Sequence, residues 1–439
     1  MRLLIINGYI LDPASGLEGY YDILTENERI LRVAKEIPAE EAQGGRVIDA
    51  TGKQVLPGFI DLHVHYREPG LEYKETIATG SAAAAAGGYT TVCPMPNTKP
   101  STDCAEVVRY VLEKAKEAGK VRVLPVGAVT KGQSGTELAD MKEMKEAGIA
   151  AVSEDGKSVM NPVLYAEGMR RAKEAGLPVF AHCEEISLVR GGVMNAGKKA
   201  EELGLPGITN SVEDIITMRD ILLAEETGAQ LHLCHCSTKY SVDFVRFARE
   251  KGIPVTAEVC PHHFAMSEED ITGDDANFKM NPPLRGKEDV EALIQGLLDG
   301  TMTVISTDHA PHSAEEKAGS MVGAPFGIVG SETAYALSNT VLVKERGMSP
   351  MQLAACMSYH PAQVLGRSHE LGALKEGYYA DITIVDPEET YCICPEDFFS
   401  KGKNTPFGGK EVTGRVYMTV CAGHITYSKE KLSEEKEEA

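Results

Sequence analysis

The chain has 439 residues, of which 43% are hydrophobic and 25% are charged, as in globular proteins with one large core and room for a second. Its formal net charge of −21 argues against a nucleic acid or an anionic membrane as a partner. It has no apolar run of about eighteen residues, which argues against a transmembrane helix. The first apolar stretch stops at Asn7 and Gly8, so it predicts a strand and not a signal peptide.

The ten cysteines lack the paired spacings of a disulfide framework, so we expect reduced thiols and a cytoplasmic location. Cys234 and Cys236 flank His235, which raises the alternative of a zinc–thiolate site. In a strand, however, alternate side chains point to opposite faces, so both cysteines should face away from His235. We therefore predict buried free cysteines at these positions.

Residues 1–54 contain short alternating stretches separated by turns, which predict the N-terminal part of a small antiparallel β-domain. Residues 55–364 alternate short apolar runs with helical stretches that are rich in Ala, Glu and Lys. The apolar runs are residues 55–65, 90–96, 121–130, 149–154, 178–182, 230–237, 254–260 and 302–308. Strand–helix units repeated in this way predict an α/β fold with a (β/α)₈ TIM barrel.

Strand signals return in residues 365–427, for example at 380–385 and 415–420. We expect these strands to join the N-terminal ones in a smaller, discontinuous β-sandwich domain built from both chain ends. Residues 428–439 are nearly all Glu, Lys and Ser, which predicts a frayed helix or a disordered tail.

The most informative motif is Asp-Leu-His-Val-His-Tyr-Arg at residues 61–67. In a strand, Asp61, His63, His65 and Arg67 would share one face. Two imidazoles and a guanidinium are costly to bury without partners, so the motif indicates a function. We interpret it as a metal held by His63 and His65, beside a cation that receives an anionic substrate.

Further polar residues close other predicted strands, at the end of the barrel where active sites lie. Four histidines and two aspartates, a ligand set that suits Zn²⁺, stand at such ends: His63, His65, Asp155, His182, His235 and Asp308. Six ligands are too many for one tetrahedral ion with an open position. They suit a pair of ions, with His63, His65 and Asp308 on one, His182 and His235 on the other, and Asp155 and a hydroxide bridging.

The sequence resembles the amidohydrolase superfamily and, within it, the type I dihydroorotases of bacteria. The resemblance rests on residues 61–70 and 307–312, with supporting matches at 95–98, 281–285 and 325–333. It implies the reversible cyclisation of N-carbamoyl-L-aspartate to L-dihydroorotate in pyrimidine biosynthesis, with one or two Zn²⁺ ions, two being favoured. The six residues at the strand ends would be the metal ligands, and Asp308 would also be the acid–base that moves the proton of the attacking hydroxide.

The resemblance also implies substrate contacts, a partner and alternatives. Arg67, Asn97 and His312 would bind the substrate carboxylate, and the ring amide would contact Asn281 and the backbone of Pro325, Phe326 and Gly327. A homodimer is the expectation for the family, and some relatives associate with aspartate carbamoyltransferase. Apart from the resemblance, residues 309–324 contain Gly319, Gly323 and several polar side chains, which predict a mobile loop over the site, with an ordinary surface loop as the alternative.

Three points remain open from the sequence. Many superfamily members bridge their metals with a carbamylated lysine, whereas this chain has Asp155 there and Lys157 as the alternative. A related cyclic amidase, acting on hydantoins, dihydropyrimidines or allantoin, is the second candidate function, and a non-catalytic scaffold is the third. Asp155 and Arg67 favour a dihydroorotase over an amidase, and the complete ligand set argues against a scaffold.

Overall fold

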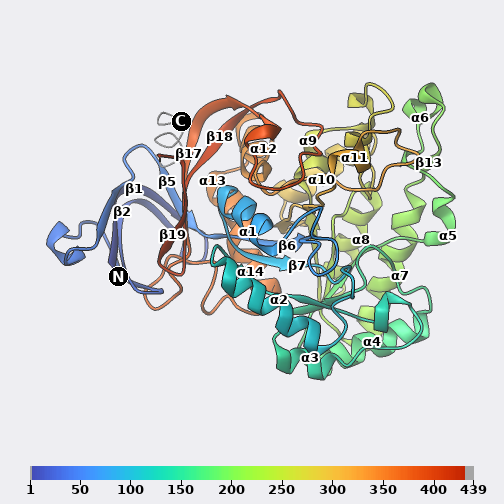
Figure 1. Cartoon of the computed structure of the whole chain (residues 1–439), viewed down its shortest axis with the longest axis horizontal. Helices are drawn as coiled ribbons and strands as arrows, with labels where there is room; N and C mark the ends of the chain where they lie inside the picture. The colour runs from blue at the N-terminus through green and yellow to red at the C-terminus, as the bar shows by residue number, and fades with distance from the viewer. Residues whose placement is uncertain (1, 431–439) are drawn as a thin grey trace.

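The fold is α/β, as predicted, and the computed structural model describes residues 2–430 of the chain (Figure 1). Its central strands form two parallel sheets, in the orders β6-β7-β8 and β16-β15-β14-β11-β10-β9. These strands are β6 (Phe59–Val64), β7 (Tyr89–Pro94), β8 (Arg122–Val123), β9 (Val126–Ala128), β10 (Ala151–Ser153), β11 (Val179–Ala181), β14 (Leu231–Leu233), β15 (Val255–Val259) and β16 (Val304–Ile305). Along the chain they alternate with helices, which accounts for the repeated pattern in the sequence.

Two short connections relate the parallel sheets to each other. Only Leu124 and Pro125 separate β8 from β9, so the single strand expected over residues 121–130 is divided at a proline, which has no N–H for the ladder. After β16, His309 forms a parallel bridge with Val64, and its carbonyl accepts a hydrogen bond of 2.8 Å from the His65 N–H. The last parallel strand therefore meets the first.

Helix α2 (Ala105–Ala118), between β7 and β8, is amphipathic: Val107, Val108 and Val111 are buried on one side. It ends where Gly119 adopts a left-handed conformation. The longer helices are α1 (Ile77–Ala86), α2 (Ala105–Ala118), α3 (Met141–Ala147), α4 (Pro162–Glu174), α7 (Ser211–Thr227), α8 (Lys239–Glu250) and α10 (Lys287–Leu298). No helix among residues 2–430 is both long and apolar enough to cross a membrane.

Both chain ends build one further sheet, at the left of Figure 1, in the order β19-β18-β17-β5-β1-β2-β3, with β4 beside β1. Its strands are β1 (Arg2–Asp12), β2 (Leu17–Glu26), β3 (Arg29–Ala34), β4 (Arg46–Asp49), β5 (Gln54–Pro57), β17 (Ile382–Cys392), β18 (Glu411–Cys421) and β19 (His424–Ser428). The two ends meet where β5 pairs with β17, with Val55 opposite Ile384.

Two details of this sheet differ from the sequence-based prediction. The sheet is mixed, not antiparallel, because β4 and β5 both run parallel to β1. Strand β19 continues to Ser428, one residue into the expected tail, because it pairs with β18 to that point. The prediction of a frayed or disordered tail otherwise falls largely on residues 431–439, which lie outside the described residues. All ten cysteines are free, as expected.

Candidate metal centre

The six predicted ligands lie together at the carboxyl ends of the parallel strands, around the carboxylate of Asp155. Asp155 Oδ1 is 3.1 Å from His63 Nε2 and 3.5 Å from both His182 Nδ1 and His235 Nε2. Asp155 Oδ2 is 3.5 Å from His65 Nε2. One carboxylate therefore touches all four imidazoles, which is the place that the sequence assigned to a bridging ligand.

The remaining ligands divide into two sides. Asp308 Oδ1 is 3.0 Å from His65 Nε2 and 3.7 Å from His63 Nε2. On the other side, His182 Nδ1 is 2.9 Å from His235 Nε2. His63 belongs to both groups, because it also lies with Asp155 and His235. The division of these side chains between two ions, and their role as ligands, stays a prediction.

The backbone at the strand ends departs from regular alternation. Arg67, His235 and Asp308 all have positive φ, at 61°, 34° and 47°, a conformation that is uncommon outside glycine. After β14 ends at Leu233, this turn lets Cys234 lie with His63 and Glu258, each offering a ligand atom within 4.8 Å of the others. The prediction that Cys234 faces away from the site is therefore wrong, because it applied strand alternation beyond the end of the strand.

The donor set fits a metal ion. His63 Nε2 and Asp155 Oδ1 are buried and make no hydrogen bond within residues 2–430, although they lie 3.1 Å apart. The other nitrogen of His63 is 3.0 Å from Glu258 Oε1, and that of His65 is 2.9 Å from Asn97 Oδ1. Such contacts fix the ring so that the Nε2 lone pair points into the cluster, as in metal-ligating histidines.

The electrostatics of the cluster favour a cation. Burial by itself would raise the pKa of Asp155, but the charge of His63 and the imidazoles of His182 and His235, each 3.5 Å from Oδ1, hold it well below its usual value. Burial likewise opposes ionisation of Asp308, yet contacts with His65 and His63 keep its pKa low. Both aspartates are therefore ionised at neutral pH, as oxygen ligands must be.

Sequence reasoning missed Glu258, which lies behind His63. It is fully buried in β15, with Oε1 3.0 Å from His63 Nδ1 and Oε2 3.0 Å from His232 Nε2. Ser306 Oγ donates a further bond of 2.6 Å to Oε2. The signal that could have revealed it is a single carboxylate in the middle of the apolar run at residues 254–260, where an unpaired charge would be costly.

Glu184 was missed as well, and it connects a predicted ligand to a predicted substrate contact. Its Oε2 is 3.4 Å from His182 Nε2, and its Oε1 accepts a bond of 2.8 Å from Asn281 Nδ2. Burial lowers the pKa of His182, but hydrogen bonds to Asp155 and Glu184 outweigh this and raise it to about 10. Asn281 is thus held beside the metal cluster, and its contact with the ring amide of the substrate stays a prediction.

The other predicted substrate residues also lie together. Arg67 is buried, with Nη2 3.4 Å from His312 Nε2, and that nitrogen is 2.7 Å from the carbonyl of Phe326. Gly327 has φ 127°, and a Cβ there would lie 2.6 Å from Ala310 Cβ, so the backbone approaches closely. Asn97 instead contacts a predicted metal ligand: its Oδ1 lies 2.9 Å from His65 Nδ1.

Residues 309–324 are anchored in this structure. Lys317 Nζ donates to the carbonyls of Ala276 and Pro325 at 2.8 and 2.9 Å, and the N–H of Met321 donates to Asp274 Oδ1 at 2.7 Å. Their role as a lid stays a prediction. Lys157 is exposed, and its Nζ donates to the carbonyl of Gln133, which favours Asp155 over a lysine carbamate as the bridge.

Comparisons with known proteins show which proteins this chain is similar to. A family model described as Dihydro-orotase-like matches residues 52–241. A dihydroorotase from Staphylococcus epidermidis is 48% identical over 428 residues, which cover 98% of this chain and 100% of that protein. A dihydroorotase from Bacillus cereus is 49% identical over 430 residues, covering 98% and 99%. Among solved structures, the chain is similar to the L-hydantoinase (dihydropyrimidinase) of Arthrobacter aurescens, with a TM-score of 0.86, 25% identity and coverage of 97% and 96%. It is also similar to a D-hydantoinase (dihydropyrimidinase) of Thermus sp., with a TM-score of 0.82, 28% identity and coverage of 97% and 95%.

Proposed function

The chain belongs to the dihydroorotase family, and from this premise we propose that it interconverts N-carbamoyl-L-aspartate and L-dihydroorotate in pyrimidine biosynthesis. It is thus a cyclic-amide hydrolase that acts on a small molecule. The observation that carries the assignment to this chain is the position of buried Arg67 and His312 beside four histidines that converge on Asp155. A substrate with a carboxylate next to a cyclic amide needs both parts.

The finer architecture is part of the proposal. A closed (β/α)₈ barrel over residues 55–364 is supported by the parallel strand order and by the bridge between Val64 and His309. A β-sandwich from residues 1–54 and 365–427 is supported by an apolar cluster in which Ile5 and Ile10 of one chain end pack with Ile382, Ile384 and Val420 of the other.

The family is metal-dependent, and we assign two Zn²⁺ ions to this chain. His63, His65 and Asp308 would hold one ion, His182 and His235 the other, and Asp155 both. Nitrogen and oxygen donors in this combination suit zinc. When bound, such ions lower the pKa of water and polarise a carbonyl.

The protein's own residues supply binding and proton transfer. Arg67 can donate two parallel hydrogen bonds to the α-carboxylate of the substrate, which positions the substrate for ring closure. Burial, with the nearby charges of Arg67 and Lys74, lowers the pKa of His312 to about 3, so His312 is neutral and leaves the positive charge to Arg67. Asp308 is ionised beside His65. In the hydrolytic direction it accepts the proton of the attacking hydroxide and returns it to the leaving nitrogen.

A second candidate function, a hydantoinase or dihydropyrimidinase, is favoured by one observation, the similarity to solved structures of those enzymes. Arg67 separates the two candidates, because hydantoin and dihydrouracil have no α-carboxylate for it to bind. The test is to follow turnover of dihydroorotate, dihydrouracil, hydantoin and allantoin, each with and without a chelator. We expect turnover of dihydroorotate alone, abolished by chelation; turnover of hydantoin or dihydrouracil with an inert dihydroorotate would reverse the assignment.

We also propose a cytoplasmic homodimer that can associate with aspartate carbamoyltransferase. Ten free cysteines support a reducing compartment. Sedimentation of the purified chain, alone and with aspartate carbamoyltransferase, tests both associations. A monomer boundary for the chain alone would contradict the dimer, and separate boundaries for the two proteins in the mixture would contradict their association.

A further inference from the structure

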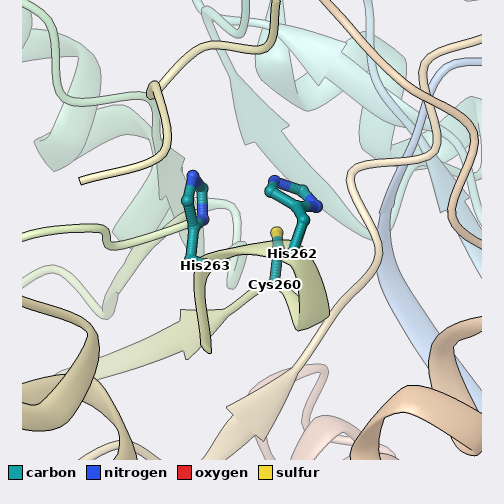
Figure 2. Close-up of side chains that lie close together, drawn as sticks. All are labelled: Cys260, His262 and His263. Carbon is teal, nitrogen blue, oxygen red and sulfur yellow. The ribbon is translucent and has the colours of Figure 1, made fainter. Parts of the chain in front are cut away.

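A second group of metal-ligating side chains lies at the end of β15, outside the six predicted ligands. Cys260, His262 and His263 lie where α9 (Pro261–Ala265) begins, and they are exposed by only 0%, 2% and 2%. Figure 2 shows both imidazole rings on the same side of the chain, with the sulfur of Cys260 at their base. The ring centroids are 4.2 Å apart, and each residue offers a ligand atom within 4.8 Å of the others.

His263 has a lone pair fixed toward the inside of this group. Its Nε2 is 2.9 Å from the carbonyl of Pro282, and because a carbonyl only accepts, Nε2 carries the proton. A second proton, on Nδ1, would have no acceptor among the described residues, so Nδ1 carries the lone pair. Nδ1 is buried and makes no hydrogen bond in the described part of the chain.

His262 and Cys260 complete the set. His262 Nε2 is likewise buried without a hydrogen bond among residues 2–430. A proton on this nitrogen would have no acceptor in that range, so the nitrogen is available as a ligand. Unmet polar atoms of this kind are rare in buried positions, and each calls for a partner.

We propose that Cys260, His262 and His263 form an additional metal site for a borderline-soft divalent cation of the Zn²⁺ class. One sulfur and two imidazole nitrogens are a donor set that zinc uses, with a fourth position left for water. The ion displaces the thiol proton of Cys260, which leaves to solvent, and a sulfur–metal bond forms. The bond from His263 to the Pro282 carbonyl is the outer contact that orients a metal-binding ring.

The position of the site suggests what it does. Pro282 follows Asn281, whose amide is bonded to Glu184 beside the six-residue cluster. An ion on His263 would therefore fix the end of β15 against the turn that carries Asn281. The role is structural support of that turn, separate from the proposed chemistry at Asp308.

Cobalt substitution of the full-length protein tests the proposal, because a cysteine ligand gives Co²⁺ a thiolate charge-transfer band in the near ultraviolet and the six-residue cluster contains no cysteine. We expect the band in the wild-type protein, its loss in Cys260→Ser, and its retention in Cys356→Ser, a matched buried cysteine elsewhere. Metal analysis should show about one ion per chain less in Cys260→Ser. Absence of the band from the wild type, or its loss in Cys234→Ser or Cys183→Ser but not in Cys260→Ser, would overturn the site.

Two further measurements keep the test decisive if Cys260→Ser does not fold. X-ray absorption of zinc-loaded Cys234→Ser, which lacks the sulfur beside His63, should still show sulfur at about 2.3 Å from part of the metal, and a spectrum with nitrogen and oxygen neighbours alone would refute the proposal. Turnover of dihydroorotate is recorded on the same samples. An active enzyme without sulfur ligation would remove this site and leave the proposed function intact, whereas sulfur ligation in an inactive protein would do the reverse.

Discussion

The mouth of the parallel strands and the interior of the chain-end sheet are both buried, but they are filled with opposite kinds of side chain. The interior of the chain-end sheet contains Ile5, Ile10 and Ile384, each fully buried among apolar neighbours. At the mouth, His63 and Glu258 are equally buried and hold charge or hydrogen bonds. The same alternation of a β-strand therefore positions both surfaces.

The two regions differ in what a substitution should do. Apolar burial contributes stability in proportion to area and has no direction. Buried charges are costly unless each has a partner, so every group at the mouth depends on its neighbours. Changes in the sheet should alter stability and spare activity per folded molecule, whereas changes at the mouth should alter metal binding or turnover.

The largest effect is expected for Asp308→Ala. Removing the proposed acid–base should lower kcat for dihydroorotate by at least about 10²–10⁴-fold, because proton transfer loses its carrier. Metal analysis should show that the remaining ligands still retain most of the metal. A variant with substantial residual turnover would remove Asp308 from the acid–base role.

Glu258→Gln tests whether the layer behind the ligands belongs to the mouth. The change removes the negative charge that faces His63 and His232, and it should weaken metal retention by about 10–100-fold in a chelator competition. Glu250→Gln, on the exposed end of α8, is the control and should behave as the wild type. Equal metal retention in both variants would confine the site to the six ligands.

Ile384→Ala tests the sheet. It removes a fully buried side chain where β17 pairs with β5, and should lower the free energy of unfolding by about 2–5 kcal/mol. Leu31→Ala, on an exposed position of β3, should change it by less than about 0.5 kcal/mol. Urea unfolding measures both, and kcat per folded molecule should stay unchanged; a lowered kcat would break the separation of the two regions.

Arg67→Lys tests whether Arg67 binds the substrate carboxylate at the mouth. Lysine keeps the charge but loses the paired hydrogen bonds to a carboxylate, so KM for dihydroorotate should rise by about tenfold or more. Arg109→Lys, on the exposed side of α2, is the matched control. An unchanged KM for Arg67→Lys would place the carboxylate elsewhere.

The smallest effect concerns Glu332, between the two regions. Burial raises its pKa from 4.5 to about 7, although the N–H groups of Phe399 and Ser400 donate to it. The folded state therefore binds more protons than the unfolded state between about pH 4.5 and 7, and stability falls as pH rises through that window. In Glu332→Gln, the decrease in the free energy of unfolding between pH 5 and pH 8 should be smaller by about 1–2 kcal/mol, as measured by urea unfolding. Parallel pH profiles for the two proteins would contradict the assignment.

Particular residues show how far the sequence could lead. His63 and His65 were found from strand alternation, and Asp155, His182 and Asp308 from their place after apolar runs. Glu258 was missed, since it is the one charged residue in its run and its partners His63 and His232 come from other strands. Cys234 was placed on the wrong side, because the positive φ of His235 breaks the alternation.

By itself the sequence determined the order of strands and helices, the six side chains at the strand ends and the family to which the chain belongs, because local periodicity and motif spacing lie within the chain. Only the tertiary structure decided which atoms meet: that Asp155 contacts all four histidines and that Glu258 holds His63. These contacts depend on how strands far apart in sequence are staggered and on left-handed turns at their ends. Neither the stagger nor the turns are encoded in the spacing of any one segment.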